Sequence, residues 1–243
     1  MDRAVYDRMG EAEAEHWWFV GRRAVLDALV RRHCALPADA RVLEAGCGTG
    51  GNLEMLSEYG RLDAFEYDDT ARRTASLKGG IDVQPGALPD EIAVPDDSYD
   101  LIALFDVLEH IEQDVPSLTT LGAKLAPGGR MLISVPAMPW LWSHHDVAHH
   151  HFRRYTKGSL RKTVEAAGLS VASSGYFNTL LFPAAISQRM VQKITGSQAP
   201  ADAIPASWLN GLLGGIFRFE RHFIGRVPMP FGLSLYAVVT RPS

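Results

Sequence analysis

Residues 42–51, which read Val-Leu-Glu-Ala-Gly-Cys-Gly-Thr-Gly-Gly, decide the fold of this chain. They begin inside a short apolar run, Arg41–Ala45, which is typical of a buried strand. Glycines follow at positions 46, 48 and 50, and residues 51–59 are compatible with a helix. Glycine permits a tight turn from strand to helix and lets a ligand approach the backbone closely. The stretch therefore predicts a nucleotide-binding loop.

The glycine spacing alone does not identify the nucleotide. Gly46, Gly48 and Gly51 also satisfy the dinucleotide fingerprint, which is a weak signal on its own. Glu44 lies two residues before the first glycine, and Glu66 ends the next predicted strand. An acid at this second point accepts hydrogen bonds from the ribose hydroxyls of NAD or of S-adenosylmethionine (SAM). The loop and its two acids leave both cofactors open.

The rest of the chain alternates strands and helices by its hydrophobic pattern. Strands are predicted at 41–45, 62–66, 81–84, 99–105, 130–135, 169–176 and 232–241, and helices at 51–59, 69–77, 114–125 and 157–167. Asp68 or Asp69 is expected to cap the second of these helices. This alternation predicts an α/β fold in which parallel strands are joined by right-handed crossovers. Ligands in such folds bind at the carboxyl ends of the strands.

Four motifs together resemble the class I SAM-dependent methyltransferases. They are Glu-x-Gly-x-Gly-x-Gly, the acid after strand two, Asp106-Val-Leu-Glu-His-Ile after strand four, and Leu125-Ala-Pro-Gly-Gly before strand five. The resemblance covers about residues 40–175. It implies a Rossmann-like, doubly wound fold with a seven-stranded, mostly parallel sheet, helices on both faces and an antiparallel last strand. It also implies SAM as the cofactor and S-adenosylhomocysteine (SAH) as its product.

Two further patterns resemble an O-methyltransferase branch associated with the modification of glycans and small molecules. One is Trp17-Trp18-Phe-x-Gly-Arg-Arg, ahead of the first strand, and the other is His145-Asp146…His151-x-Arg-Arg-Tyr155. Both lie outside the glycine loop. They imply a small-molecule or glycan acceptor.

Composition excludes several classes. The 243 residues carry a net charge of −4, so the basic field of a nucleic-acid-binding protein is absent. Cys34 and Cys47 are too few for a disulfide framework, and we expect a reducing, cytoplasmic location. The N-terminus has no apolar region typical of a signal peptide. Residues 166–188 are uncharged, but glycine, asparagine and proline divide them, so we expect a strand and a helix rather than a membrane span.

We expect a single methyltransferase domain over residues 1–243, with three additions. Residues 1–38 would form a helical cap whose aromatic side chains pack on the core or close over the ligands. Residues 137–158 would border the acceptor. Residues 178–231 form an insertion with two helical stretches, which would act as a lid, a packing element, a homodimer interface or a peripheral membrane contact.

The resemblance implies a cofactor pocket along the carboxyl ends of the first strands. Glu44 and the first glycines would contact the methionyl end, Glu66 would bind the ribose hydroxyls, and Tyr67 would lie against the adenine. The expected cofactor-binding residues are Glu44, Gly46, Cys47, Gly48, Gly50, Asn52, Glu66, Tyr67, Ala87, Leu88, Phe105, Asp106 and His110.

Asp106, Glu109 and His110 are spaced i, i+3 and i+4, so on a helix they would share one face. Two carboxylates and an imidazole can bind Mg²⁺ or another divalent cation. This set resembles that of metal-assisted O-methyltransferases, in which the ion binds neighbouring acceptor oxygens and lowers the hydroxyl pKa. The alternative is that no metal binds, since Leu-Glu-His also occurs in methyltransferases that use none.

Five of the nine histidines lie at 144–151, beside Asp146. A histidine paired with a carboxylate can act as a general base near neutral pH. We expect His145 to be the base or a metal ligand, with His151 as its partner, and His144, His149 and His150 to face solvent. The expected acceptor-binding residues are Trp18, Trp142, Arg153, Arg154 and Tyr155, the two arginines holding an acceptor carboxylate or phosphate, or forming surface ion pairs.

The leading hypothesis is a SAM-dependent O-methyltransferase that acts on a hydroxyl of a sugar, a glycan or another small molecule. His145, and a divalent ion if one binds, would activate that hydroxyl. Two alternatives stay open: metal-free N- or C-methylation, and a SAM- or SAH-binding module without turnover. The sequence leaves the acceptor and the oligomeric state undetermined.

Overall fold

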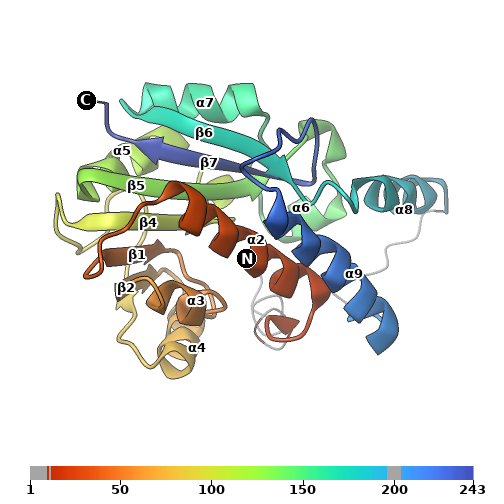
Figure 1. Ribbon diagram of the computed structural model, residues 1–243, viewed down its shortest axis with the longest axis horizontal. Coiled ribbons are helices and arrows are strands. Elements are labelled where there is room, and N and C mark those ends of the chain that lie inside the picture. Colours follow the sequence, from red (N-terminus) through yellow and green to blue (C-terminus); the bar gives the residue numbers. More distant parts are fainter. Residues whose placement is uncertain (1–9, 11, 196–203, 243) are drawn as a thin grey trace.

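A seven-stranded sheet forms the core of the chain (Figure 1), whose computed structural model describes residues 10, 12–195 and 204–242. The strands are β1 Arg41–Ala45, β2 Arg61–Glu66, β3 Gln84–Pro85, β4 Tyr99–Phe105, β5 Leu125–Pro136, β6 Ser170–Phe177 and β7 Ser234–Thr240, in the order β3-β2-β1-β4-β5-β7-β6. β7 runs antiparallel to both β5 and β6, whereas the other neighbouring pairs are parallel. This confirms the predicted Rossmann-like class, including the antiparallel last strand.

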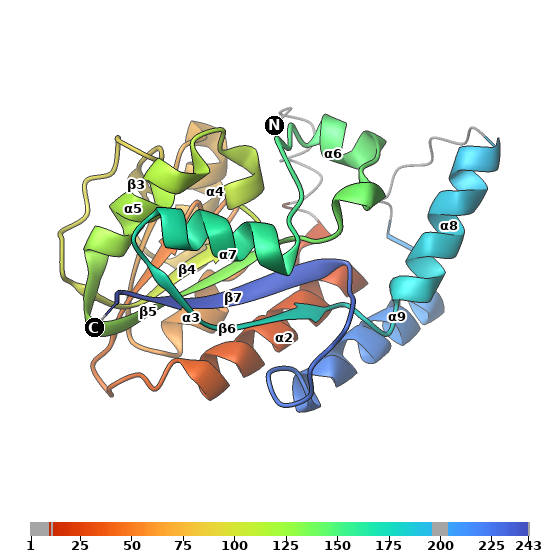
Figure 2. The ribbon, with the colours of Figure 1, turned by 90° about the horizontal axis from the view of Figure 1, so that it is seen from above.

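Helices cover both faces of the sheet (Figure 2). They are α2 Trp17–His33, α3 Leu53–Ser57, α4 Asp69–Gly79, α5 Asp114–Lys124, α6 His144–Ala148, α7 Lys157–Ala166, α8 Phe182–Thr195 and α9 Ser207–Phe219. Three 3₁₀ turns complete the described elements: η1 Leu108–His110, η2 Pro139–Leu141 and η3 Glu220–His222. Figure 2 shows α5 and α7 on one side of the sheet and α2 and α9 on the other.

Alternation along β4 explains why both faces of the sheet are covered. Leu101, Ala103 and Phe105 pack into the cluster that contains the α2 side chains. Ile102 and Leu104 pack into the opposite cluster, with the side chains of α5 and α7. Successive side chains of a strand point to opposite faces, so a continuous apolar run needs a helix layer on each side.

The predicted insertion at 178–231 supplies one of these covering helices, because α9 packs closely on α2. A Cβ atom added to Gly21 of α2 would lie 2.6 Å from Cγ of Phe217 in α9, so only glycine fits there. Phe217 also stacks on Phe177 of β6, with ring centroids 6.3 Å apart. α9 is therefore part of the core, whereas α8 extends away from the sheet (Figure 1).

A buried carboxylate fixes the start of the insertion to its end. Glu220 is fully buried and accepts the backbone amides of Asn178, Thr179 and Leu180 at 2.7–2.8 Å. Burial raises the pKa of Glu220, and these three amides oppose the rise. The contact joins the residues after β6 to η3.

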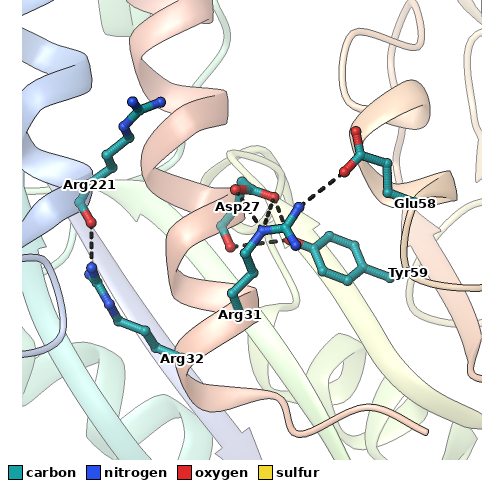
Figure 3. Close-up of polar contacts among 6 residues, drawn as sticks. All are labelled: Asp27, Arg31, Arg32, Glu58, Tyr59 and Arg221. Carbon is teal, nitrogen blue, oxygen red and sulfur yellow. Dashed lines mark hydrogen bonds and ion pairs between the residues drawn. The ribbon is translucent and has the colours of Figure 1, made fainter. Parts of the chain in front are cut away.

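Polar contacts at the solvent side join α2 to its neighbours (Figure 3). Arg31 lies 3.1 Å from Asp27, one turn earlier, and 3.0 Å from Glu58 beyond α3. The Tyr59 hydroxyl donates to the same Asp27. Arg32 donates to the carbonyl of Arg221 at 2.6 Å, next to α9. α2 therefore connects the glycine-loop half of the molecule to the insertion.

Some predicted boundaries are wrong. The third strand is only Gln84–Pro85, not 81–84, because Ser76 Oγ binds the amide of Val83 and holds the preceding residues against α4. The first crossover helix, α3, is short, whereas Asp68 caps α4 as predicted. Within the described residues no helix is both long and apolar enough to cross a bilayer. The predicted cap at 1–38 lies partly outside those residues, as does the middle of the insertion, 196–203.

Candidate active site

The glycine loop follows β1 and has the conformation that the sequence predicts. Gly46 has φ 71°, and a Cβ there would lie 3.0 Å from the side chain of Val107, so the loop is packed against the residues after β4. Gly48 has φ 56°, but a Cβ there would meet nothing within 4 Å. Positive φ favours glycine at both positions. The open face at Gly48 leaves room for a ligand.

Glu44 lies near the end of β1, directly before this loop. It is 1% exposed, and Asn52 Nδ2 donates to its Oε1 at 2.7 Å. Its Oε2 is buried with no hydrogen-bond partner. Burial raises the pKa of Glu44 to about 8. An unpaired buried carboxylate oxygen costs free energy, which a cationic ligand group would recover.

Glu66 ends β2 and is 5% exposed. The amides of Gly48 and Asp68 donate to its two oxygens at 2.8 and 2.9 Å, and these bonds oppose the rise in pKa that burial causes. Each oxygen keeps a second lone pair for a hydroxyl. Next to this carboxylate, the amide of Gly86 donates to the backbone carbonyl of Glu66, and Ala87 and Glu91 form an isolated antiparallel β-bridge.

The remaining residues expected at the adenine differ in exposure. Tyr67 is 79% exposed, which leaves its ring available to a ligand. Leu88 is half-buried against the core, and Cys47 is 5% exposed inside the loop. Burial raises the pKa of the Cys47 thiol, so the thiol is neutral.

These features fit SAM. Glu44 Oε2 suits the cofactor's ammonium group, and Glu66 suits its ribose hydroxyls.

Part of the N-terminal segment lies over the same loop. Gly10 packs near Thr49, and a Cβ on Gly51 would lie 2.7 Å from the Glu13 carboxyl.

Arg22 is a residue of the site that the sequence reasoning missed. Its Nε lies 2.6 Å from Asp106 Oδ2, and its Nη2 donates to the carbonyl of Phe105 at 3.2 Å. The guanidinium lies over the Trp18 ring, 5.1 Å from its centroid. The spacing of Trp18 and Arg22, one helical turn apart, is the signal that could have indicated it.

This arrangement bears on two of the expected ligand contacts. Trp18 is partly buried against the core and Arg22 covers one face of its ring, so its contact with an acceptor stays a prediction. The Phe105 side chain is buried in the cluster on the α2 side, so its backbone alone borders the site.

The predicted metal set is only partly brought together. Glu109, His110 and His151 each offer one ligand atom, and these three atoms lie within 4.8 Å of one another. Asp106 is not in this group: it has φ 54°, precedes the 3₁₀ turn η1, and pairs with Arg22 and Ser134. Asp106 does not share a helical face with Glu109 and His110, as its spacing predicted, because the residues directly after β4 form a 3₁₀ turn and not an α-helix.

Asp146 organises the histidine segment. It is fully buried and contacts His151 Nδ1 at 3.0 Å, Arg154 Nε at 2.6 Å and the amide of Ser143 at 2.8 Å. Burial alone would raise its pKa, but the bonds from His151 and Arg154 outweigh burial and hold the pKa well below its usual range. His151 therefore has a carboxylate partner, whereas the role expected for His145 as the base stays a prediction.

The other histidines divide by burial. His149 is 7% exposed, so the prediction that it faces solvent is wrong: its ring packs 4.0 Å from that of His145. His144 and His150 are exposed, as predicted. Burial lowers the pKa of His110 to about 3, with further lowering from His151 and His149.

The arginines expected to bind the acceptor are engaged within the chain. Arg154 is 8% exposed and donates to Asp146 and to the carbonyl of Ala137, which removes it as an anion-binding group. Tyr155 is 2% exposed and donates to Asp114 at 2.9 Å. Arg153 lies 2.5 Å from the same carboxylate. Of the expected acceptor residues, Trp142 is the most accessible, at 44%.

The fold and the loop with its two carboxylates define a class I methyltransferase, and comparison with known proteins agrees. A family model described as "Methyltransferase domain" matches residues 19–174, more than half of the chain. The chain therefore belongs to this methyltransferase family, and it is a SAM-dependent methyltransferase.

Individual proteins that resemble this chain agree with the family assignment. A protein of Mycolicibacterium smegmatis named "Probable S-adenosylmethionine-dependent methyltransferase" is 26% identical over 94% of this chain and 90% of its own length. The ubiquinone biosynthesis O-methyltransferase of Xanthomonas axonopodis is 29% identical, but the match covers 40% of this chain and 44% of that protein. A methyltransferase solved with the Trm112 activator of Haloferax volcanii has TM-score 0.65 at 20% identity, covering 99% of this chain and 95% of that one.

Proposed function

We propose that this enzyme is an O-methyltransferase that transfers the methyl group of SAM to a hydroxyl of a sugar, a glycan or another small molecule. The observation that carries the proposal is the Asp146–His151 pair of the α6 segment, whose His151 lies close to Glu109 and His110, just after β4. Val107, in the same segment, packs against Gly46 of the cofactor loop. This proximity supports a proton-accepting role for the cluster.

The chemistry requires little more than positioning and deprotonation. When bound, SAM supplies a methyl group on a sulfonium, and the acceptor oxygen forms a C–O bond as the C–S bond breaks to give SAH. The chain must orient the hydroxyl in line and receive its proton. The Asp146 carboxylate holds Nδ1–H of His151, so Nε2 is the nitrogen that can take the proton. A divalent ion bound nearby is the second way to activate the hydroxyl.

The named activities of some relatives support a hydroxyl acceptor. Several ubiquinone biosynthesis O-methyltransferases match this chain over 39–51% of its length, at 28–31% identity. We propose the same bond type here, with the acceptor itself left to experiment. The two free cysteines are consistent with our proposal of a reducing, cytoplasmic location.

The proposal is tested by methyl transfer from labelled SAM to a panel of acceptors: sugars, catechol-like diols, and amines of similar size. We expect labelled methyl ethers from at least one hydroxyl acceptor. His151→Gln should lower kcat by about 10²–10⁴-fold, because the base is removed, while SAH still binds. Transfer to amines alone would instead establish N-methylation.

A further inference from the structure

We propose that Glu109, His110 and His151 form a binding site for a single divalent transition-metal ion. The three side chains come from two segments, η1 and the residues after α6, and each offers a ligand atom within 4.8 Å of the other two. The rings of His110 and His151 lie edge to face, with centroids 4.6 Å apart. The amide of Phe152 donates to the Glu109 carbonyl at 2.8 Å, which fixes the two segments together.

Glu109 supplies the second, independent observation. The residue is 1% exposed, and its Oε2 is buried without a hydrogen-bond partner. A buried carboxylate without a partner is costly, and such groups in proteins are usually paired or coordinate metals. The nearest compensating charges, Arg22 and Arg154, are already paired with Asp106 and Asp146. A bound cation would supply the partner that Glu109 lacks.

His151 has the outer contact that metal-binding histidines require. His151 Nδ1 contacts Asp146, which Arg154 and Ser143 hold in turn, so Nε2 is left to face a metal. With the ion bound, Nε2 is a ligand and the ion activates the hydroxyl; Nε2 acts as the base only in the metal-free enzyme. His110 lies beside His151, with the two ring centroids 4.6 Å apart. A carboxylate or backbone carbonyl behind each imidazole is the usual arrangement around metal-ligating histidines.

The donor set indicates which ion binds. Two imidazoles and one carboxylate favour borderline ions such as Zn²⁺, Mn²⁺, Fe²⁺ or Co²⁺, whereas Mg²⁺ favours all-oxygen sites. This differs from the set of two carboxylates and one imidazole predicted from the sequence. Three protein ligands leave coordination positions open, and two neighbouring acceptor oxygens would suit them. That use of the ion rests on the proposed hydroxyl acceptor, whereas binding of the ion does not.

Titration of the metal-stripped full-length protein with Co²⁺, followed by its visible d–d absorption, tests the site. We expect one Co²⁺ per chain and competition by Zn²⁺ but not by Mg²⁺. Glu109→Gln, His110→Gln and His151→Gln should each weaken binding by about 100-fold or more. Asp146→Asn, which alters the contact behind His151 and also removes the charge that Arg154 pairs with, should weaken it by about 10–100-fold. The exposed His144→Gln is the matched control and should bind like the wild type.

SAH binding, measured on every variant, identifies any variant that has failed to fold. Failure of Co²⁺ to bind, or equal binding by the wild type and all three ligand variants while SAH still binds, would overturn the metal site. Methyl transfer to a hydroxyl by the metal-stripped enzyme would leave the proposed function intact even then. The two proposals therefore fail separately.

Discussion

Glu44 illustrates how a single residue connects the fold to cofactor binding. It lies in a buried strand, one oxygen is bound by Asn52, and the other has no partner within the described structure. Glu13, Glu66 and Arg22 are the charged groups that act on it. A cofactor ammonium placed beside Oε2 would favour the ionised form of this carboxyl and form an ion pair with it.

Glu44 also predicts a pH dependence for the cofactor-free protein. Its folded-state pKa, about 8, lies above the ordinary value of 4.5, so the folded form binds the proton more tightly. Its stabilising contribution is therefore complete below about pH 4.5 and is lost as the pH rises to about 8. Glu44→Gln should remove this part of the slope, on the order of 3–5 kcal/mol, in urea unfolding measured across that range.

The same variant should also weaken SAH binding by at least about tenfold, because the amide cannot form an ion pair with the cofactor. If the free energy of unfolding changed with pH in the same way for the wild type and Glu44→Gln, Glu44 would not be a buried carboxyl with a raised pKa.

Arg22 predicts a contrast within one helix. Arg22→Met leaves Asp106 without its buried partner and should cost about 3–5 kcal/mol in the free energy of unfolding. Arg31→Met, also in α2, removes an ion pair in which Arg31 is 56% exposed and should cost less than about 1 kcal/mol. Chemical denaturation of both variants measures the difference, and similar costs would contradict the assigned role of Arg22.

For single residues, the sequence predicted correctly the positions that depend on local backbone geometry. Glu44 and Glu66 lie at or near the ends of strands, and an apolar run followed by glycines locates such ends reliably. Asp106 and His149 were misplaced for a physical reason. Helical periodicity does not hold in a 3₁₀ turn, and the burial of His149 depends on ring packing against His145 and His151, which the sequence pattern does not show.

Among the elements, the packing of α2 on α9 was least visible in the sequence. The two helices are far apart along the chain, and the glycines of α9 read as helix-breaking. The structural role of each α9 glycine depends on its position. A Cβ atom added to Gly214 would lie near Trp17, whereas one added to Gly211 would have no neighbour within 4 Å. A hydrophobic pattern alone cannot assign an inserted helix to a particular face of the sheet.

This contact predicts opposite effects for two Gly→Ala changes. Gly21→Ala would place a Cβ 2.6 Å from Cγ of Phe217 and should destabilise the protein by about 1–3 kcal/mol, despite alanine's better helix propensity. Gly211→Ala meets no neighbour and should stabilise it by up to about 1 kcal/mol. Thermal unfolding compares them, and a stabilising Gly21→Ala would rule out the close packing of α2 and α9.

On the proposed function, the molecule divides into a cofactor half and an acceptor half that meet after β4. The cofactor half consists of the glycine loop, Glu44 and Glu66, all on β1 and β2 or directly after them. The proposed acceptor half would consist of η1 and the histidine segment, which the bond from the Phe152 amide to the Glu109 carbonyl joins. Exposed apolar residues of α9, such as Trp208 and Leu212, lie in neither half, and a membrane or homodimer contact there stays a prediction.

Equilibrium binding of SAH to the wild type, Glu66→Gln and His151→Gln, by titration calorimetry, tests this division most directly. We expect Glu66→Gln to weaken binding by at least about tenfold, because a ribose-binding carboxylate is lost. His151→Gln should bind SAH within about twofold of the wild type, although its methyl transfer is impaired. Unchanged binding by Glu66→Gln, or loss of SAH binding in a folded His151→Gln variant, would contradict the division into a cofactor half and an acceptor half.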